Sequence, residues 1–438
     1  MLSGRGSGAG NVTIRSPASR AQDDFCQVPS GPMAIGGKQT GAMSERLGTP
    51  DQGRLRDLLE ELERIHRPSA SAGERRAAEW LVERFAELGA EARIEAAPAH
   101  GTYWWPLGIG AALGAAGGLA ALRGRRLLGA ALGAAGAAGI ADDFPPGRRR
   151  LRRLLPRRET YNVVCELGPA EAKRTIVLIA HHDAAHSGLV FHPALPEIAD
   201  RLGMIERTDT SPPLMAPVLG GPLLAALGAV TGRRLLSKLG LLLGAGSAAA
   251  MLEIGLRETV PGANDNGASV VALLALAERL IEEPPEGIRV ILLSTGSEES
   301  FSEGMKAFGE RHFHELPRES TFFLCLEAIG SPHLLVLRGE GFLKMREYPR
   351  RALALIDGLA AELGIWLFPN LRLRNGTDGM EPLAAGYETA ALCGCTDLKQ
   401  PANYHWSHDL AENVDFGTVA DAVRLSEASI RRLDQDWL

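Results

Sequence analysis

The sequence is poor in the features that mark disulfide-stapled proteins and nucleic-acid binders. It has 5 cysteines in 438 residues, an odd number without C-x-x-C spacing, which argues against a disulfide framework and a structural zinc ribbon. Cys393 and Cys395 stand two apart at the end of an apolar run; we interpret them as core and strand-end residues, with a metal or redox pair as the alternative. Acidic residues (53) outnumber basic ones (47), so the formal net charge of −6 excludes nucleic acid as an expected partner.

The first 45 residues also lack any periodic apolar pattern. They are rich in glycine, serine and alanine and cannot bury enough apolar surface to order themselves, so we expect a disordered tail. They show no basic segment followed by an apolar one, as a secretory signal would. Met43 directly precedes the first helical pattern and is an alternative start, which would make the first 42 residues a product of start-site choice.

The rest of the chain alternates between helical and strand patterns. Apolar residues recur every three or four positions over residues 53–66 and from residue 73 to Gly89, which predicts two helices. Gly89 ends the second helix, and a strand is expected between it and residue 97. Short β-branched runs predict strands at 161–167, 175–180, 289–294, 321–327 and 334–338. Helical patterns lie at 268–283, 303–313, 350–363 and 416–434. This order predicts an α/β fold, with a mixed, mostly parallel twisted sheet and helices on both faces, formed by residues 46–102 and 159–438.

Two apolar stretches, residues 103–141 and 213–252, interrupt that alternation. Each has two arms around a basic tip; the first arm has about the 20 uncharged residues that a bilayer requires, and the second arm is shorter. Glycine and alanine at this density suit close helix packing in lipid, and Trp104 and Trp105 suit a membrane interface. We predict two helical hairpins in contact with membrane lipid; the alternative is a pair of buried hairpins in a soluble protein.

The charges around the hairpins give opposing indications of their orientation. The positive-inside rule would place the basic tips of the hairpins in the cytoplasm and the main domain outside the cell. The basic residues of the tips are Arg123, Arg125, Arg126, Arg233, Arg234 and Lys238. The flank of the first hairpin opposes them with Arg148, Arg149, Arg150, Arg152, Arg153, Arg157 and Arg158, a cluster that is either a solvated loop or a contact with anionic headgroups. Because roughly 100 residues would have to be exported ahead of the first hairpin without a signal, the sequence favours a cytoplasmic main domain.

Ionisable side chains gather at the ends of the predicted strands, where open α/β sheets bind their ligands. His181 and Asp183 follow the strand 175–180, and Asp183 is placed to support a metal-binding imidazole. Asp265 lies between two asparagines in a turn that opens the helix 268–283. It belongs either to an ordinary turn and N-cap or to a site where its carboxylate bridges two cations.

Further acidic residues and histidines follow the later strands. Glu298 and Glu299 come after the strand 289–294; in a loop such neighbours can point in different directions, one binding a metal and the other holding a water as general base, and a solvated acidic loop is the alternative. Glu327 ends an apolar strand, where a carboxylate needs a partner such as a metal. His405 and His408 precede the last helix, and one of them would complete the set.

Two histidines, three carboxylates and a spare glutamate are the inventory of a carboxylate-bridged pair of zinc ions. The order His-x-Asp, Asn-Asp-Asn-Gly, Glu-Glu, strand-end acid and Tyr-His resembles peptidase family M28, which includes leucyl aminopeptidases, glutamate carboxypeptidase and glutaminyl cyclase. The resemblance runs from about residue 53 to the C-terminus and is interrupted by the hairpins. It implies a zinc-dependent metallopeptidase with two zinc ions per chain, an exopeptidase of the aminopeptidase type that acts on peptides.

The resemblance also implies a role for each residue. Its zinc ligands would be His181, Asp265, Glu299, Glu327 and His405, with Asp265 bridging and with His181 and Glu327 on different zinc ions. Glu298 would be the general base, Asp183 would support the first histidine ligand, and Tyr404 would polarise the scissile carbonyl. The segment 375–386 resembles the family's substrate-pocket loop, with Thr377 and Asp378 at the pocket positions.

The chain departs from the family pattern in two places. The aminopeptidases more often have aspartate where this chain has Glu327, and the gap between His181 and Asp265 is lengthened by the second hairpin. His405 is preferred over His408 as the last ligand, because His408 fits the acid region that follows the Tyr-His pair in the family.

Two other functions compete with the peptidase. One is a catalytically silent relative that serves as a membrane-associated binding module; the complete ligand set with Glu298 argues against it, since buried carboxylates are costly without a purpose. The other is a cyclase of the glutaminyl-cyclase kind, which uses a single zinc and is disfavoured by five candidate ligands.

Overall fold

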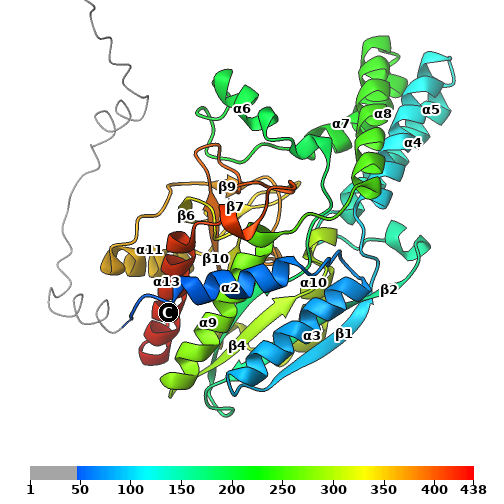
Figure 1. Ribbon diagram of the computed structural model, residues 1–438. Helices are drawn as coiled ribbons and strands as arrows, with labels where there is room; N and C mark the ends of the chain where they lie inside the picture. Colours follow the sequence, from blue (N-terminus) through cyan, green and yellow to red (C-terminus); the bar gives the residue numbers. More distant parts are fainter. Residues whose placement is uncertain (1–46) are drawn as a thin grey trace, which may run out of the picture. The chain divides into compact units, whose positions relative to one another are not determined.

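A seven-stranded mixed sheet forms the centre of the protein (Figure 1). The computed structural model describes residues 47–438, so the tail predicted for residues 1–45 and the alternative start at Met43 lie outside the described residues. In sheet order the strands are β1 (Ala92–Ala99), β2 (Arg158–Leu167), β4 (Ile288–Thr295), β3 (Arg174–His181), β5 (Thr321–Glu327), β10 (Glu388–Cys395) and β6 (His333–Val336). The four central strands run parallel, and β1, β2 and β6 pair antiparallel at the edges. The predicted mixed α/β fold is confirmed.

Helices cover both faces of this sheet. One face carries α2 (Gln52–Glu63), α3 (Ala72–Glu87), α9 (Ala268–Glu282), α11 (Arg350–Leu363) and α13 (Phe416–Gln435) over the larger core. The other carries α10 (Glu303–His312), α12 (Met380–Ala385) and a small sheet of β7 (Gly339–Glu340), β8 (Arg346–Glu347) and β9 (Arg372–Leu373). Asp51, Ser71 and Asp415 cap α2, α3 and α13 by accepting backbone N–H bonds, which fixes where these helices begin. Cys393 and Cys395 are buried in β10.

The two apolar stretches form a single bundle of four helices. The first stretch contributes α4 (Trp104–Leu122) and α5 (Arg126–Asp143), and the second contributes α7 (Ala216–Thr231) and α8 (Arg234–Leu256). They pack side by side and project away from the sheet (Figure 1). Between β3 and α7 lie the short helices η3 (Leu189–Phe191) and α6 (Ala194–Arg201). Two of the four, α4 and α8, are long and apolar enough to cross a membrane; α7 is apolar but shorter.

The bundle has small residues inside and large apolar residues outside. A Cβ added to Gly114 would lie 2.5 Å from the ring of Pro222, and one added to Gly244 would lie 2.8 Å from the carbonyl oxygen of Ala111, so the helices meet backbone to backbone. The outward positions are exposed leucines, among them Leu127, Leu128, Leu223, Leu227, Leu235, Leu242 and Leu252. A water-soluble bundle has the opposite distribution, with its leucines in the core.

Candidate metal centre

The order of the strands brings the predicted ligands together. His181 is the last residue of β3, which lies between β4 and β5 in the sheet. Glu298 and Glu299 form the short helix η5 (Glu298–Ser300) just after β4, and Glu327 is the last residue of β5. Since the three strands are parallel, their carboxyl ends meet at one edge, where open α/β sheets bind ligands.

Five side chains form two groups that share Asp265. In the first group, His181 Nε2 lies 3.3 Å from Glu327 Oε1 and 3.4 Å from Asp265 Oδ1. In the second, His405 Nε2 lies 3.2 Å from Glu299 Oε2 and 3.4 Å from Asp265 Oδ2. The two oxygens of one aspartate therefore face two different histidine and carboxylate pairs, as a bridging ligand would.

The pairing of histidine with carboxylate differs from the expectation that His181 and Glu327 would serve different zinc ions. The structure places both in one group because β3 and β5 are adjacent parallel strands that end side by side. Glu299 instead joins His405, which lies in the loop after β10.

The donor set fits zinc. Two atoms bonded to one tetrahedral zinc at about 2.0–2.2 Å lie roughly 3.3–3.6 Å from each other, which the distances of 3.2–3.4 Å approach in both groups. Asp265 Oδ1 and Glu299 Oε1 are buried and form no hydrogen bond, which leaves them free for a cation. Burial and the carboxylate of Asp265 raise the pKa of Glu327 to about 8 even beside His181, so the cluster as it stands is short of positive charge.

Asp183 holds both the histidine and the acidic loop. Its carbonyl oxygen and Oδ1 lie 3.2 and 3.4 Å from His181 Nδ1, which turns Nε2 towards the cluster. Its carboxylate also accepts the backbone N–H groups of Glu298 (2.9 Å) and Glu299 (3.1 Å) and the hydroxyl of Ser69 (2.6 Å). Asp183 therefore holds residues of both groups and belongs to neither of them.

Asp265 is fixed by its neighbours and does not cap α9. Its backbone N–H donates to Asp409 (3.1 Å), which also accepts the N–H of Asn264 (2.7 Å). The side chain of Asn266 donates to the carbonyl of Leu326 and accepts the N–H of Ala328, the two residues that flank Glu327. The N-cap of α9 makes no side-chain hydrogen bond, so the alternative of an ordinary N-cap is wrong. The turn instead fixes the positions of Asp265 and Glu327.

Comparison with known proteins relates part of the chain to a family. A sequence profile described as Peptidase family M28 matches residues 249–429. This segment of the chain is therefore similar to peptidase family M28. The matched segment holds Asp265, Glu299, Glu327 and His405, whereas His181 precedes it. No curated protein matches the sequence.

Solved structures share the fold of this protein at low sequence identity. An aminopeptidase from Aneurinibacillus sp. superposes with a TM-score of 0.54 and 12% identity, over 90% of this chain and 95% of that one. A glutaminyl cyclase from Tannerella forsythia gives 0.53 and 14%, over 88% and 99%. A Zn-dependent exopeptidase from Parabacteroides distasonis gives 0.51 and 12%, over 88% and 99%. The family and this shared fold support a zinc-dependent hydrolase.

Glu298 and Tyr404 flank the centre without belonging to the two groups around Asp265. Glu298 Oε2 lies 3.9 Å from His181 Nε2, and both Glu298 and Tyr404 line the cavities above the cluster. The ring of Tyr404 stacks on His405 at 3.9 Å between centroids, and its hydroxyl accepts a hydrogen bond from Asn375 (3.4 Å). Their positions leave both side chains able to reach a molecule bound at the centre.

The two predicted pocket residues lie in different places. Thr377 lines one of these cavities, and its N–H donates to Glu340 at 2.7 Å. Asp378 is buried and accepts the hydroxyl of Thr295, the residue that pairs with His181 in the sheet. His408 is exposed and lies apart from the cluster, whereas His405 is buried within it.

Sequence reasoning missed Arg67. This buried guanidinium donates to the carbonyls of His182 (2.8 Å), Pro261 (2.6 Å) and Gly262 (2.8 Å), and so joins the end of β3 to the turn that carries Asp265. Its neighbours in sequence, Arg64 and Arg75, are surface residues in ordinary ion pairs, and no sequence pattern distinguishes Arg67 from them.

Proposed function

We propose that this protein is a member of peptidase family M28 and a two-zinc exopeptidase of the aminopeptidase type. The proposal rests on the position of Asp265 between two groups of side chains. Its two carboxylate oxygens face different groups, and each group has one histidine and one further carboxylate. Zinc held by His181, Glu327, Glu299, His405 and the shared aspartate would act as a Lewis acid and lower the pKa of bound water.

The residues around the cluster have the positions that amide hydrolysis requires. Glu298, with its backbone N–H held by Asp183, takes a proton from the attacking water and returns it to the leaving amine as the C–N bond breaks. The Tyr404 hydroxyl donates to the scissile carbonyl oxygen, where negative charge develops. Asp183 keeps His181 and the Glu298–Glu299 loop in a fixed relation throughout.

We also propose that the four-helix bundle lies in a lipid bilayer. Its outward leucines would contact acyl chains. In lipid the hydrophobic effect does not hold helices together, and the close contacts at the glycines would do so instead. The lengths of α4 and α8 agree with this placement. In water the same leucines would form an apolar surface of the size that normally marks an interaction site.

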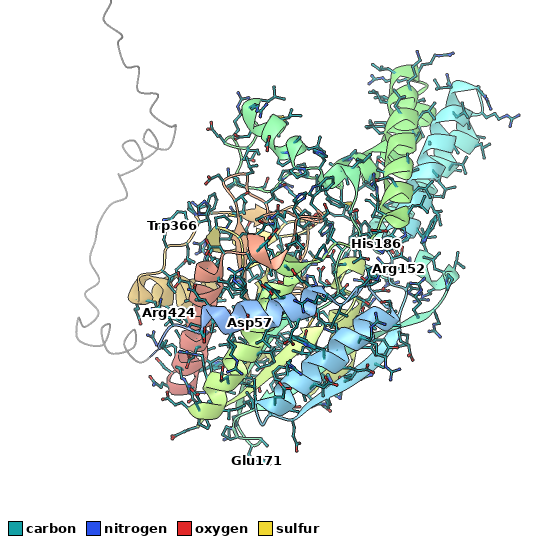
Figure 2. All side chains as sticks on the ribbon, in the orientation of Figure 1. Asp57, Arg152, Glu171, His186, Trp366 and Arg424 are labelled. Atoms are coloured by element: carbon teal, nitrogen blue, oxygen red, sulfur yellow. The ribbon has the colours of Figure 1, made fainter. Side chains whose placement is uncertain are left out.

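Zinc content and turnover test the proposal together. We expect about two zinc ions per chain by elemental analysis of detergent-purified protein, and hydrolysis of unblocked peptides from the amino end. Glu298→Gln should keep its zinc and lose about 10²–10⁴-fold in turnover. The control is Glu171→Gln, in the loop before β3 at the opposite end of the sheet (Figure 2).

Each rival gives a different result in the same measurement. Full turnover in Glu298→Gln would show that another group is the base. A zinc content near zero after reconstitution would contradict the proposed peptidase activity and favour a membrane-associated binding module. One zinc per chain with release of ammonia from peptides with N-terminal glutamine would support a cyclase instead.

A further inference from the structure

An apolar groove lies where the bundle meets the metal centre. It has a volume of about 490 Å³ and runs between α8, the start of α7 and the segment around η3. Phe191, Leu214, Leu242 and Met251 are among its walls. Of the described residues that line it none is charged, and only Tyr103 and Ser247 bring a side-chain oxygen. The volume falls within the roughly 300–1,000 Å³ of pockets that hold small ligands.

The groove adjoins the cavity above the metal centre. Tyr103, Phe191, Leu214 and Met215 line both the groove and the cavity that contains Glu298, Glu299 and His405. A peptide held at the centre therefore lies next to the groove, with these four side chains between the two cavities.

Aromatic contacts mark the place where the two cavities meet. The ring of Phe191 meets the rings of His405 and Tyr404 edge-on, with centroids 4.5 and 5.6 Å away. Tyr103, at the start of the first hairpin, stacks on Phe301, just beyond the Glu298–Glu299 loop, at 4.9 Å. Residues from the first hairpin and from the connection between β3 and α7 thus shape the wall of the cavity over the proposed catalytic residues.

The other end of the groove opens on the outward face of the bundle. Leu242, on its rim, is 68% exposed, and Leu195 on α6 is 49% exposed. Leu242 belongs to the outward apolar surface of the bundle that we place in contact with lipid, and Leu195 faces the groove from α6. The groove consequently lies between the proposed lipid-facing surface and the cavity above the metal centre.

We propose that the substrate is a peptide with several consecutive apolar residues next to its scissile bond, and that these residues occupy the groove. This inference rests on the proposed peptidase and names its substrate class. A charged or strongly polar residue there would lose its hydration without gaining a partner, since no charged side chain lines the walls. Aliphatic side chains would instead be removed from water, which should raise kcat/KM about tenfold or more for each large side chain that is fully buried.

Gly246 allows the groove to be blocked without disturbing the fold. It lines the groove on α8, and a Cβ added to it would meet no atom within 4 Å, so Gly246→Leu places a side chain in open space. Gly220 on α7 is a matched control: a Cβ there also meets nothing within 4 Å, and it does not line the groove. Both changes replace a helical glycine with the same residue.

The test compares two peptides with the same first residue, one continuing in leucine and the other in serine, with the full chain in phosphatidylcholine vesicles. We expect wild type and Gly220→Leu to prefer the leucine peptide by at least about tenfold in kcat/KM, and Gly246→Leu to lose most of that preference with its zinc content unchanged. Equal ratios in Gly246→Leu and wild type, or a wild type that prefers the serine peptide, would overturn the groove as the substrate's binding place.

A binding measurement separates failure of the groove from failure of the peptidase. A fluorescent leucine peptide is titrated against Glu298→Gln, and partition into protein-free vesicles is subtracted. If no peptide is cleaved by wild type but the leucine peptide binds and Gly246→Leu abolishes the binding, the proposed activity is wrong and the groove stands as an apolar-peptide site. If Gly246→Leu binds as tightly as the control variant, the inference about the groove is wrong whatever the activity.

Discussion

Asp143 and Arg152 form a buried ion pair that ties the first hairpin to the acidic loop of the metal centre. Arg152 Nε and Nη2 donate to the two carboxylate oxygens of Asp143, at the end of α5, at 2.8 and 2.9 Å. Its third nitrogen donates to the carbonyl of Ser300 (2.6 Å) and lies 3.4 Å from Glu303. Figure 2 labels Arg152 at the end of the bundle that joins the sheet domain. The loop that carries Glu298 is therefore held from two sides, by Asp183 and by this arginine.

Arg152→Met should destabilise the protein strongly. It leaves Asp143 and Glu303 buried without their common partner, and breaking a buried pair costs about 3–5 kcal/mol in free energy of unfolding. The neighbouring Arg153 is exposed, so Arg153→Met is a control that should change this free energy by less than about 0.5 kcal/mol. Thermal or denaturant unfolding in detergent measures both; equal stability of the two variants would show that the pair is not structural.

Glu303 should make the stability of the protein depend on acid. Burial acts to raise the pKa of this carboxyl, but Arg152 and the contacts with His100 outweigh it and hold the pKa well below its usual value of 4.5. A carboxyl whose pKa is lower in the folded than in the unfolded state stabilises the fold above the unfolded pKa, and this contribution is lost as the pH falls below about 4.5.

The denaturant concentration at the unfolding midpoint of wild type should therefore decrease as the pH is lowered from 6 to 3.5. In Glu303→Gln this decrease should be smaller. Glu310→Gln, at an exposed position on the same helix, should follow wild type. A Glu303→Gln profile parallel to that of wild type would show that other carboxylates cause the acid sensitivity.

Asp265→Ala should abolish both metal sites in a single step. Both groups depend on this side chain, so we expect the zinc content to fall from about two to near zero at micromolar zinc. Asp57→Ala, on the outer surface of α2, should leave the content unchanged (Figure 2). Retention of one zinc in Asp265→Ala would mean that one group binds metal without the bridging carboxylate.

Leu227→Arg distinguishes a bilayer from water around the bundle. Leu227 is half exposed on α7, so in water the change should cost less than about 0.5 kcal/mol. In the apolar core of a bilayer an arginine costs about 2.5–3.5 kcal/mol, which would reduce the fraction of chains recovered in the membrane. Leu343→Arg, at an exposed position near β7, should behave as wild type in that assay. Normal recovery of Leu227→Arg would argue for a solvent-exposed bundle.

The sequence predicted the parts of this protein that depend on local pattern. Strand ends are recognisable from apolar runs that stop at ionisable residues, which is how His181 and Glu327 were found. No range was predicted for β10, although Cys393 and Cys395 were interpreted as strand-end residues, because Glu388–Cys395 are mostly small and only one is β-branched. The partnership of His181 with Glu327 was missed because it depends on the order of strands in the sheet.

The supporting residues depend on long-range geometry in the same way. Asp409 positions Asp265 from 144 residues away, and Arg67 reaches carbonyl groups on two distant segments. A buried arginine or aspartate resembles its surface counterparts in sequence, since burial is decided by what packs around it. The association of the two apolar stretches into one bundle has the same origin, because the contacts between their glycines form only in the folded chain.

The lengthened connection between His181 and Asp265 has a consequence for the order of assembly. The second hairpin leaves the sheet after one of these residues and returns before the other, yet their side chains finish 3.4 Å apart. His405 comes from the last tenth of the chain. The cluster is complete only when the inserted helices have packed and β10 is in the sheet. Metal binding there would therefore report that the chain has folded through its last tenth, with the inserted helices in position.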